Sequence, residues 1–180
     1  RGKVRIIGGQ WRSRLLTFPE IPDLRPTPDR IRETVFNWLG QDLTGLNCLD
    51  LFAGSGALGF EAASRGASQV VMVDTDSKIY TALHENKEKL QATQVELKMI
   101  NALNFLNSDV RKFDVIFLDP PYRLELLPKL LPLLPSHLEK GGLVYTETKS
   151  PWTADKHWCA KRSAKAGAVS YQLLELARNG

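Results

Sequence analysis

From residue 46 onward, short apolar runs alternate with stretches in which apolar residues recur at helical spacing. The runs predict strands at 46–52, 69–73, 95–100, 114–118 and 143–148. The periodic stretches predict helices at 56–65, 77–91, 102–106 and 124–134, the last one interrupted by proline. Such alternation predicts an α/β domain with a mostly parallel sheet and helices on both faces. Ligands of such sheets bind beyond the carboxyl ends of the strands.

The two ends of the chain depart from this alternation. Residues 3–8 and 12–18 alternate around Gly8-Gly9, which predicts a β-hairpin. Residues 156–163 and 168–177 predict a second, closing hairpin. Both ends therefore add antiparallel strands to the alternating centre.

Helix starts are signalled by capping residues at two places. Four prolines make residues 19–28 an extended loop, after which a helix is expected to run to Leu39. Thr27 is its expected N-cap and Pro28 its first helical residue. Ser77 is the expected cap of the helix at 77–91, with Asp76 an exposed acid at its start.

Charge is distributed unevenly along the 180 residues. The overall formal charge is +4, but residues 1–32 carry a net +5, residues 149–167 a net +4 and residues 33–148 a net −5. Basic ends around an acidic centre favour a polyanion held by flanking elements and a cationic group bound between them. A merely solvated basic surface is the alternative.

Composition excludes several classes of protein. No apolar run has transmembrane length and no signal-peptide pattern is present, so we expect no membrane association. Cys48 and Cys159 lie far apart, and with three scattered histidines they give no metal-ligand spacing. We therefore expect a single reduced, cytoplasmic chain without metal, monomeric because no long apolar edge is evident. It begins at Arg1 rather than methionine, which leaves open whether residues precede it.

A glycine-rich turn joins the first predicted central strand to its helix. It reads Gly54-Ser55-Gly56-Ala57-Leu58-Gly59, and Asp74 follows at the end of the next strand. This G-x-G-x-x-G pattern alone would predict a dinucleotide site. Asp50, just before the turn, would repel a pyrophosphate but attract a cationic cofactor such as S-adenosylmethionine. Asp50 could alternatively cap amides of the loop.

Two further positions fit an adenosyl ligand. Asp74 offers two acceptor oxygens to a ribose diol. Asn101 and the backbone of Ala102, after the third strand of the series, could contact the adenine edge. An ordinary loop asparagine explains Asn101 equally well.

The strand at 114–118 ends in Asp119-Pro120-Pro121-Tyr122. Prolines stop the ladder, so the Pro120 carbonyl is held outside it. Asp119 and that carbonyl could accept both N–H groups of an exocyclic amino group on a base, while Tyr122 stacks on the base. A rigid turn with a buried tyrosine is the alternative.

The motifs DLFAGSGALGFE and DPPY, with RIIGGQWRSRLLTF and RPTPDRIRETVFNWL before them, resemble the RsmD family of class I methyltransferases over nearly the whole chain. The resemblance implies a Rossmann-like fold, a seven-stranded sheet with an antiparallel last strand and an N-terminal hairpin extension. It also implies S-adenosylmethionine as cofactor and the N2 amino group of a guanine in small-subunit ribosomal RNA, or its assembly particle, as target. It divides the chain into a basic RNA-contacting part, 1–26, and a methyltransferase domain, 27–180.

The resemblance also assigns residues to the cofactor. Phe52, Gly54 and Gly56 would line it, with Asp74 on its ribose and Asn101 near its adenine. Thr27 and Arg32 become candidates for its methionine end. Arg32 could instead bind an RNA phosphate or form a structural ion pair with a helix glutamate.

Cationic and aromatic residues of the first hairpin suit structured RNA. The candidates are Lys3, Arg5, Trp11, Arg12 and Arg14. Trp11 could alternatively be a packed anchor of the hairpin. A second phosphate contact is expected from Lys156, Lys161, Arg162 and Lys165.

Three other functions remain open. DPPY also serves N6-adenine methyltransferases acting on DNA or RNA, although no separate DNA-reading segment is evident. A nicotinamide-dependent oxidoreductase fits the glycines but not Asp50. A binding module without catalysis is disfavoured because DPPY is intact.

Overall fold

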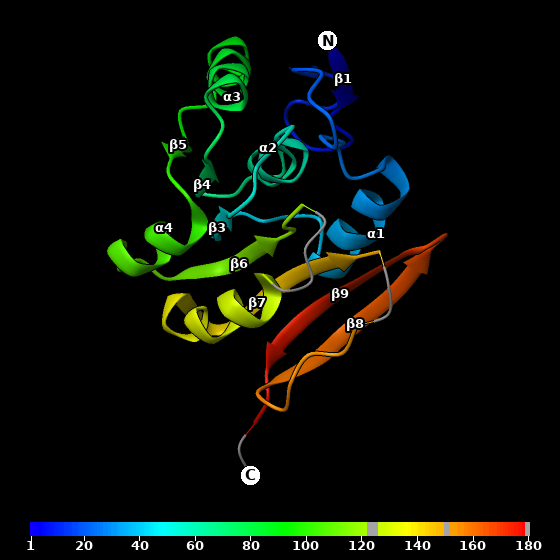
Figure 1. The fold of residues 1–180 in the computed structure, drawn as a ribbon. Helices are drawn as coiled ribbons and strands as arrows, with labels where there is room; N and C mark the ends of the chain where they lie inside the picture. Colours follow the sequence, from blue (N-terminus) through cyan, green and yellow to red (C-terminus); the bar gives the residue numbers. More distant parts are fainter. Residues whose placement is uncertain (122–125, 150–151, 179–180) are drawn as a thin grey trace.

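The computed structural model describes residues 1–121, 126–149 and 152–178. Its strands are β1 (Gly2–Arg5), β2 (Leu15–Phe18), β3 (Asn47–Asp50), β4 (Gln69–Asp74), β5 (Val95–Met99), β6 (Phe113–Leu118), β7 (Leu138–Thr148), β8 (Trp158–Ala166) and β9 (Val169–Leu176). Seven of them form one sheet in the order β5-β4-β3-β6-β7-β9-β8, and β1 pairs with β2 separately (Figure 1). Neighbours from β5 to β7 are parallel, whereas β9 is antiparallel to β7 and β8. The expected mostly parallel sheet with an antiparallel last strand is confirmed.

The helices are α1 (Asp29–Leu39), α2 (Ala57–Ser64), α3 (Ser77–Leu90), α4 (Ala102–Ser108) and α5 (Leu126–Leu130), followed by 3-10 turns at Leu131–Leu133 and Pro135–His137. Side chains of α1, α2 and α3 share a core with one face of the sheet, and those of α4 and α5 with the other. Adjacent residues of one strand, such as Cys48 and Leu49 of β3, therefore lie in different cores. Helices on both faces are confirmed, and they explain the uninterrupted apolar strands.

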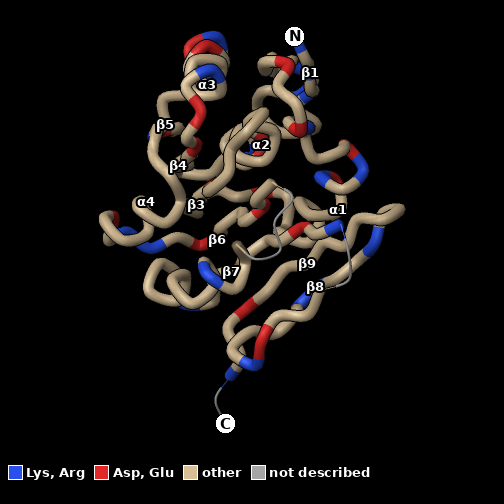
Figure 2. The backbone as a smooth tube through the Cα atoms, viewed as in Figure 1, with Lys and Arg blue, Asp and Glu red and all other residues tan. Residues whose placement is uncertain are grey.

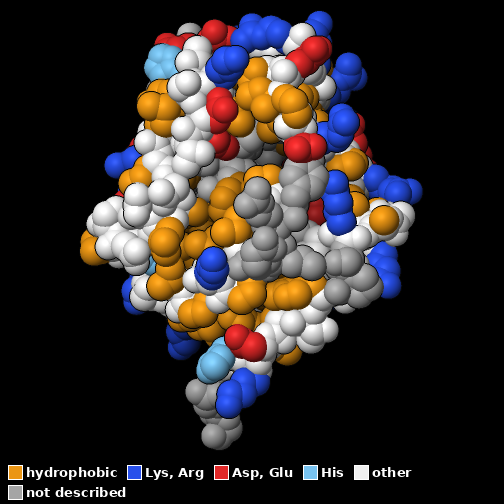
Figure 3. Space-filling model, viewed as in Figure 1, with side chains coloured by type: hydrophobic (Ala, Val, Ile, Leu, Met, Phe, Trp, Pro, Cys, Tyr) orange, Lys and Arg blue, Asp and Glu red, His pale blue; other side chains and the backbone are white. Residues whose placement is uncertain are grey.

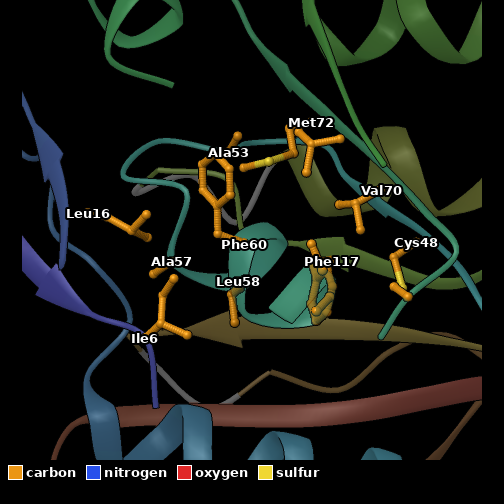
Figure 4. Close-up of a cluster of buried hydrophobic side chains, with 14 of the residues drawn as sticks. Ile6, Leu16, Cys48, Ala53, Ala57, Leu58, Phe60, Val70, Met72 and Phe117 are labelled. Atoms are coloured by element: carbon orange, nitrogen blue, oxygen red, sulfur yellow. The ribbon is translucent and has the colours of Figure 1, made fainter. Parts of the chain in front are cut away.

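The N-terminal hairpin is part of the core on the α2 face rather than a free arm. Ile6 and Leu16 lie together with Ala57, Leu58 and Phe60 of α2 in this core (Figure 4). Ile6 and Leu16 are each 1% exposed. Any surface that the hairpin presents to a ligand is therefore fixed relative to the sheet.

Polar contacts also attach this hairpin to α2. The Glu61 carboxylate accepts the backbone N–H groups of Ile7 and Gly8, each at 2.9 Å. The Ser64 hydroxyl donates to the Gly8 carbonyl at 2.6 Å and accepts from the Trp11 N–H at 2.9 Å. A Cβ at Gly9 would lie 2.0 Å from the Ser64 carbonyl oxygen, so this approach requires glycine.

Several predicted boundaries are wrong in detail. The N-cap of α1 is Pro28, without a side-chain cap, so Thr27 is not the cap. Asp76, rather than Ser77, caps α3, because its side chain accepts the N–H groups of Lys78 and Ile79. β7 begins at Leu138, five residues earlier than the apolar run indicates, since Gly141 and Gly142 break the pattern without ending the strand.

The remaining differences concern irregular segments. Residues 6–14 connect β1 and β2, a longer link than a Gly8-Gly9 turn would give. The helix expected at 124–134 is the five-residue α5 followed by 3-10 turns, and its first residues lie outside the described ranges. Within the described ranges, no helix is long and apolar enough to cross a membrane.

Candidate active site

Acidic residues collect at the carboxyl edge of the sheet. Asp50 ends β3, Asp74 ends β4, Asp119 follows β6, and Glu147 lies next to the end of β7. The parallel register aligns these ends, because β3 pairs in register with both β4 and β6, and β6 with β7. Acidic positions lie near the tips of β6 and β7 (red in Figure 2). Hydrophobic side chains are exposed across the middle of the face seen in Figure 3.

The glycine loop turns the chain from β3 into α2. Gly54 and Gly56 have φ of 52° and 85°, a conformation that favours glycine. A Cβ at Gly56 would lie 2.7 Å from the Phe60 ring. A Cβ at Gly54 would lie 3.0 Å from Leu24, so the segment before α1 covers this loop. The close packing explains why the pattern needs both glycines.

Asp50 is buried beneath this loop, with 2% of its surface exposed. Its Oδ2 accepts the Gly59 N–H of α2 at 3.1 Å, so the expected amide contact exists. Burial, opposed by the Gly59 hydrogen bond and assisted by the nearby Asp74 charge, raises the pKa of Asp50 to about 7. A buried acid of this kind gains from a cationic neighbour, so the amide contact and the attraction of a cation are compatible.

Asp74 is half-buried beside the glycine loop. Its Oδ2 accepts the Gly54 N–H at 3.0 Å, and its Oδ1 accepts the Asp76 N–H at 3.1 Å. Burial raises its pKa. Each carboxylate oxygen can accept a second hydrogen bond, so a ribose diol can still bind.

The candidates for the adenine edge lie one strand farther out. Asn101 is exposed and caps α4, with its Oδ1 accepting the Asn104 N–H at 2.7 Å. This capping contact supports the ordinary structural explanation of Asn101. Ala102 is buried and Phe52 is half-buried. All three remain candidates for cofactor contact because of their positions. Asn101 and Ala102 lie at the carboxyl edge beside β4, and Phe52 lies in the turn after β3.

Arg32 is wrongly assigned to the cofactor. Its side chain is 1% exposed, and its Nη1 donates to Glu61 Oε1 and to the Arg5 carbonyl, both at 3.0 Å. Nε donates to the Thr27 carbonyl at 2.9 Å, and Nη2 pairs with Asp29. The guanidinium is therefore occupied by the protein, as the structural alternative anticipated. Thr27 is itself buried and contributes that carbonyl.

Trp11 is wrongly assigned to RNA. It is 4% exposed and belongs to the hydrophobic core, because the hairpin turns this side chain toward the protein. A buried indole cannot stack on a base. Lys3, Arg5, Arg12 and Arg14 are exposed and stay available to a polyanion.

Asp119 follows β6 directly, half-buried, and Pro120 is buried. Burial first, then the charge of Glu147, a hydrogen bond with Glu147 and the charge of Asp50 raise the pKa of Asp119 well above its usual value. Glu147 was not among the predicted site residues, although an acid ending an apolar strand is the signal shared by Asp50 and Asp74. Tyr122 lies outside the described residues.

Together these groups form an acidic strand edge beside a glycine turn. The described residues include no group of three or more His, Cys, Asp or Glu side chains that could hold a metal ion. The donor set fits an organic cation carrying a diol: buried carboxyl groups for the charge and Asp74 for the hydroxyls. A second group could reach Asp119 from the same edge.

Comparisons with known proteins agree with this geometry. A family described as "Conserved hypothetical protein 95" matches residues 4–175. The curated Ribosomal RNA small subunit methyltransferase D of Escherichia coli K12 is 40% identical over 184 aligned positions, covering 99% of this chain and 93% of that protein. The solved yhhF protein of Escherichia coli is 39% identical, with a TM-score of 0.87 over 97% of this chain and 98% of that one.

A more distant structure shows the fold alone. An RNA methyltransferase of Salinibacter ruber, solved with S-adenosyl-L-homocysteine, is 19% identical, with a TM-score of 0.67 over 83% of this chain and 92% of that one. The family match covers nearly all of the chain, and the fold is that of the class I methyltransferases. The chain therefore belongs to the RsmD family of Rossmann-like methyltransferases.

Proposed function

We propose that this chain transfers a methyl group from S-adenosylmethionine to the N2 amino group of a guanine in small-subunit ribosomal RNA. The observation that carries the proposal is the position of Asp119 and Pro120 at the end of β6, beside the strand that leads into the glycine loop. The name of the Escherichia coli relative supports ribosomal RNA of the small subunit as the substrate. The choice of guanine N2 rests on the family resemblance.

The cofactor is held by the turn after β3 and by the end of β4. Gly54 and Gly56 allow close approach, with Phe52 beside them, and Asp74 accepts from the ribose hydroxyls. Asn101 and Ala102 border the adenine. Asp50 provides negative charge near the sulfonium. The same charge would repel a cofactor that carries phosphate groups.

The target amino group lies against Asp119 and the Pro120 carbonyl. Two acceptors hold both N–H groups and direct the nitrogen lone pair toward the methyl group. Tyr122, which lies outside the described residues, is proposed to stack on the base. Extruding a base costs a few kcal/mol, and stacking returns about 1–3 kcal/mol.

RNA is held by exposed cations at the two ends of the chain. The first set is Lys3, Arg5, Arg12 and Arg14 around the hairpin. The second set lies on β8, the edge strand beside β9 in the sheet, which exposes Lys161, Arg162 and Lys165. Basic positions follow both elements in Figure 2. The chain acts as a cytoplasmic monomer in this proposal.

The test is methyl transfer from labelled S-adenosylmethionine to small-subunit particles that lack modifications. RNA and protein are separated, and the RNA is digested to nucleosides. We expect label in N2-methylguanosine. Label in N6-methyladenosine would transfer the assignment to adenine, and label in protein would remove RNA as the substrate.

A nicotinamide cofactor is tested by binding alone. A ligand that binds only the native state raises the unfolding temperature. We expect S-adenosylhomocysteine to raise it and NAD to leave it unchanged. The reverse result would favour an oxidoreductase.

A further inference from the structure

Asp119, directly after β6, and Glu147 of the neighbouring strand β7 are adjacent at the carboxyl edge of the sheet, and a side-chain hydrogen bond with Glu147 is among the causes that raise the pKa of Asp119. The parallel register pairs Phe117 with Tyr145 and Leu118 with Thr146, which brings Asp119 and Glu147 side by side at the end of the ladder. Two carboxyl groups can hydrogen-bond only when one of them keeps a proton, because two carboxylates are both acceptors. A proton shared by the two acids is therefore favoured over two adjacent carboxylates.

The surroundings of Asp119 disfavour its carboxylate. Burial raises the pKa of Asp119, and Glu147 and Asp50 are the charges that raise it further. Tyr145, on the same face of β7 as Glu147, is fully buried. Burial, followed by the charges of Glu147, Asp119 and Tyr171, raises its pKa also, so the hydroxyl stays neutral. Among the described residues, the charges that act on Asp119 come from β3 and β7, and Tyr171 of β9 acts on Tyr145.

The Tyr145 hydroxyl is a second, independent observation. Its oxygen is buried and has no hydrogen-bond partner among the described residues. A buried hydroxyl without a partner is costly, and a hydroxyl hydrogen can turn toward a nearby anion. The Tyr145 hydroxyl can therefore donate a hydrogen bond when Asp119 and Glu147 are both ionised, and this would stabilise the ionised pair.

The proposed reaction needs such a state. An exocyclic amino group that is methylated must lose a proton, and a protonated Asp119 cannot take it. A general base works best when its pKa lies near the operating pH. An aspartate with its usual pKa is too weak a base near neutral pH. The negative charge of Glu147 disfavours the Asp119 carboxylate and so raises its pKa.

We propose that Glu147 is a positioning residue that makes Asp119 the acceptor of the proton released from the target amino group. The inference rests on the proposed function. The proton held by the pair passes to water before transfer, and the Asp119 carboxylate then accepts an N–H hydrogen bond. In the transfer the nitrogen–methyl bond forms, the sulfur–methyl bond breaks, and its electron pair stays on sulfur as a neutral thioether. The proton moves from nitrogen to Asp119, and from there to water.

The test compares Glu147→Gln with the native chain in single-turnover methyl transfer from about pH 5 to about pH 9. Glutamine keeps the size and a hydrogen bond but removes the charge that disfavours the Asp119 carboxylate. We expect the acid limb of the native profile to move to lower pH in the variant, because the Asp119 carboxylate no longer faces the charge of Glu147. An unchanged limb would overturn the inference, because a purely structural Glu147 would alter the rate without moving its pH dependence.

A second readout does not depend on activity. Carboxyl ¹³C resonances of labelled aspartate can be titrated in native protein and in Glu147→Gln, with Asp119→Asn identifying the signal of Asp119. We expect the Asp119 signal to titrate at lower pH in the variant, and equal titration in both would also overturn the inference. Glu139→Gln removes an exposed acid near the start of β7 and is the matched control, which should leave the titration of Asp119 unchanged. Label outside N2-methylguanosine in the native chain would defeat the proposed function, whereas these titrations would still decide whether Glu147 controls Asp119.

Discussion

At the scale of single residues, the site depends on acids that the fold keeps partly desolvated. The pKa of Asp50 in the folded chain is raised from 3.8 to about 7. A raised carboxyl pKa contributes stability that is fully present below pH 3.8 and is lost as the pH rises through about 7. Near neutral pH the free protein therefore holds an unfavourable charge that a bound cation can offset.

Replacing this acid by an amide should reduce the pH dependence of stability. We expect Asp50→Asn to lose less free energy of unfolding than the native chain between about pH 4 and about pH 8, by roughly 2–4 kcal/mol. The amide has no ionised form to desolvate and can still accept the Gly59 N–H. Urea denaturation across this range measures the difference, and parallel curves for the two proteins would contradict it.

The same substitution should separate two cofactor forms. S-adenosylmethionine carries a sulfonium and S-adenosylhomocysteine does not. We expect Asp50→Asn to weaken the first about tenfold and the second much less. In the native chain, affinity for the sulfonium form should rise with pH through about 7, because binding favours the ionised acid.

Calorimetry with both ligands measures this difference. Asp76→Asn is the matched control, since it removes an equal charge from a half-buried helix cap and keeps an acceptor for the N–H groups of Lys78 and Ile79. Equal losses for both ligands in Asp50→Asn would show that Asp50 is only a structural acid.

At the scale of elements, the hairpin and α2 form one unit around Glu61. This carboxylate is fully buried and accepts from Ile7, Gly8, Arg32 and Arg65. Removing one partner of a buried ion pair leaves an uncompensated charge. The basic hairpin is held in place by this contact and by Asn86 of α3, whose amide exchanges two hydrogen bonds with the Thr17 backbone.

Glu61→Gln should therefore destabilise the whole chain rather than the hairpin alone. We expect a loss of roughly 3–5 kcal/mol in the free energy of unfolding, because two guanidinium groups lose their acid. Denaturant unfolding measures it, with Glu88→Gln on the exposed face of α3 as control. A loss as small as that of the control would show that Glu61 is not the anchor.

Periodicity predicted the elements here but not the contacts between them. The alternation of strands and helices was readable because parallel strands are apolar on both faces. Glu61 lies in an otherwise apolar helix, and its partners are up to 54 residues away in sequence, so no local pattern signals them. Arg32 and Trp11 were misassigned for the same reason, since only tertiary packing decides whether a cation or an indole faces solvent. Glu147 carries the same strand-end signal as Asp50 and Asp74, but its place beside Asp119 depends on the pairing of β6 with β7.

At the scale of the whole molecule, basic ends flank an acidic site. Exposed cations on the hairpin and on β8 suit RNA phosphates, while the acids at the strand edge suit the cofactor sulfonium. If about five phosphates are neutralised, the log–log slope of affinity against salt should be near −3 to −4. Removing cations should make the slope shallower.

Replacing Lys161, Arg162 and Lys165 by glutamine should reduce this slope by about 0.7 for each phosphate that the variant no longer neutralises. Filter binding of small-subunit RNA across a salt series measures it. Lys112→Gln is the control, because this exposed lysine precedes β6 and so lies at the amino edge of the parallel strands, away from the site. An unchanged slope in the triple variant would show that these three cations of β8 do not contact RNA phosphates.

The central claim is that the end of β6 carries methyl transfer to a guanine amino group. The most direct measurement is single-turnover transfer to unmodified small-subunit particles by the native chain and Asp119→Ala, with nucleoside analysis and S-adenosylhomocysteine binding measured in parallel. We predict N2-methylguanosine from the native chain and a loss of at least about a hundredfold in the variant, with cofactor binding retained. Equal transfer by both proteins, or label in another nucleoside, would contradict the account.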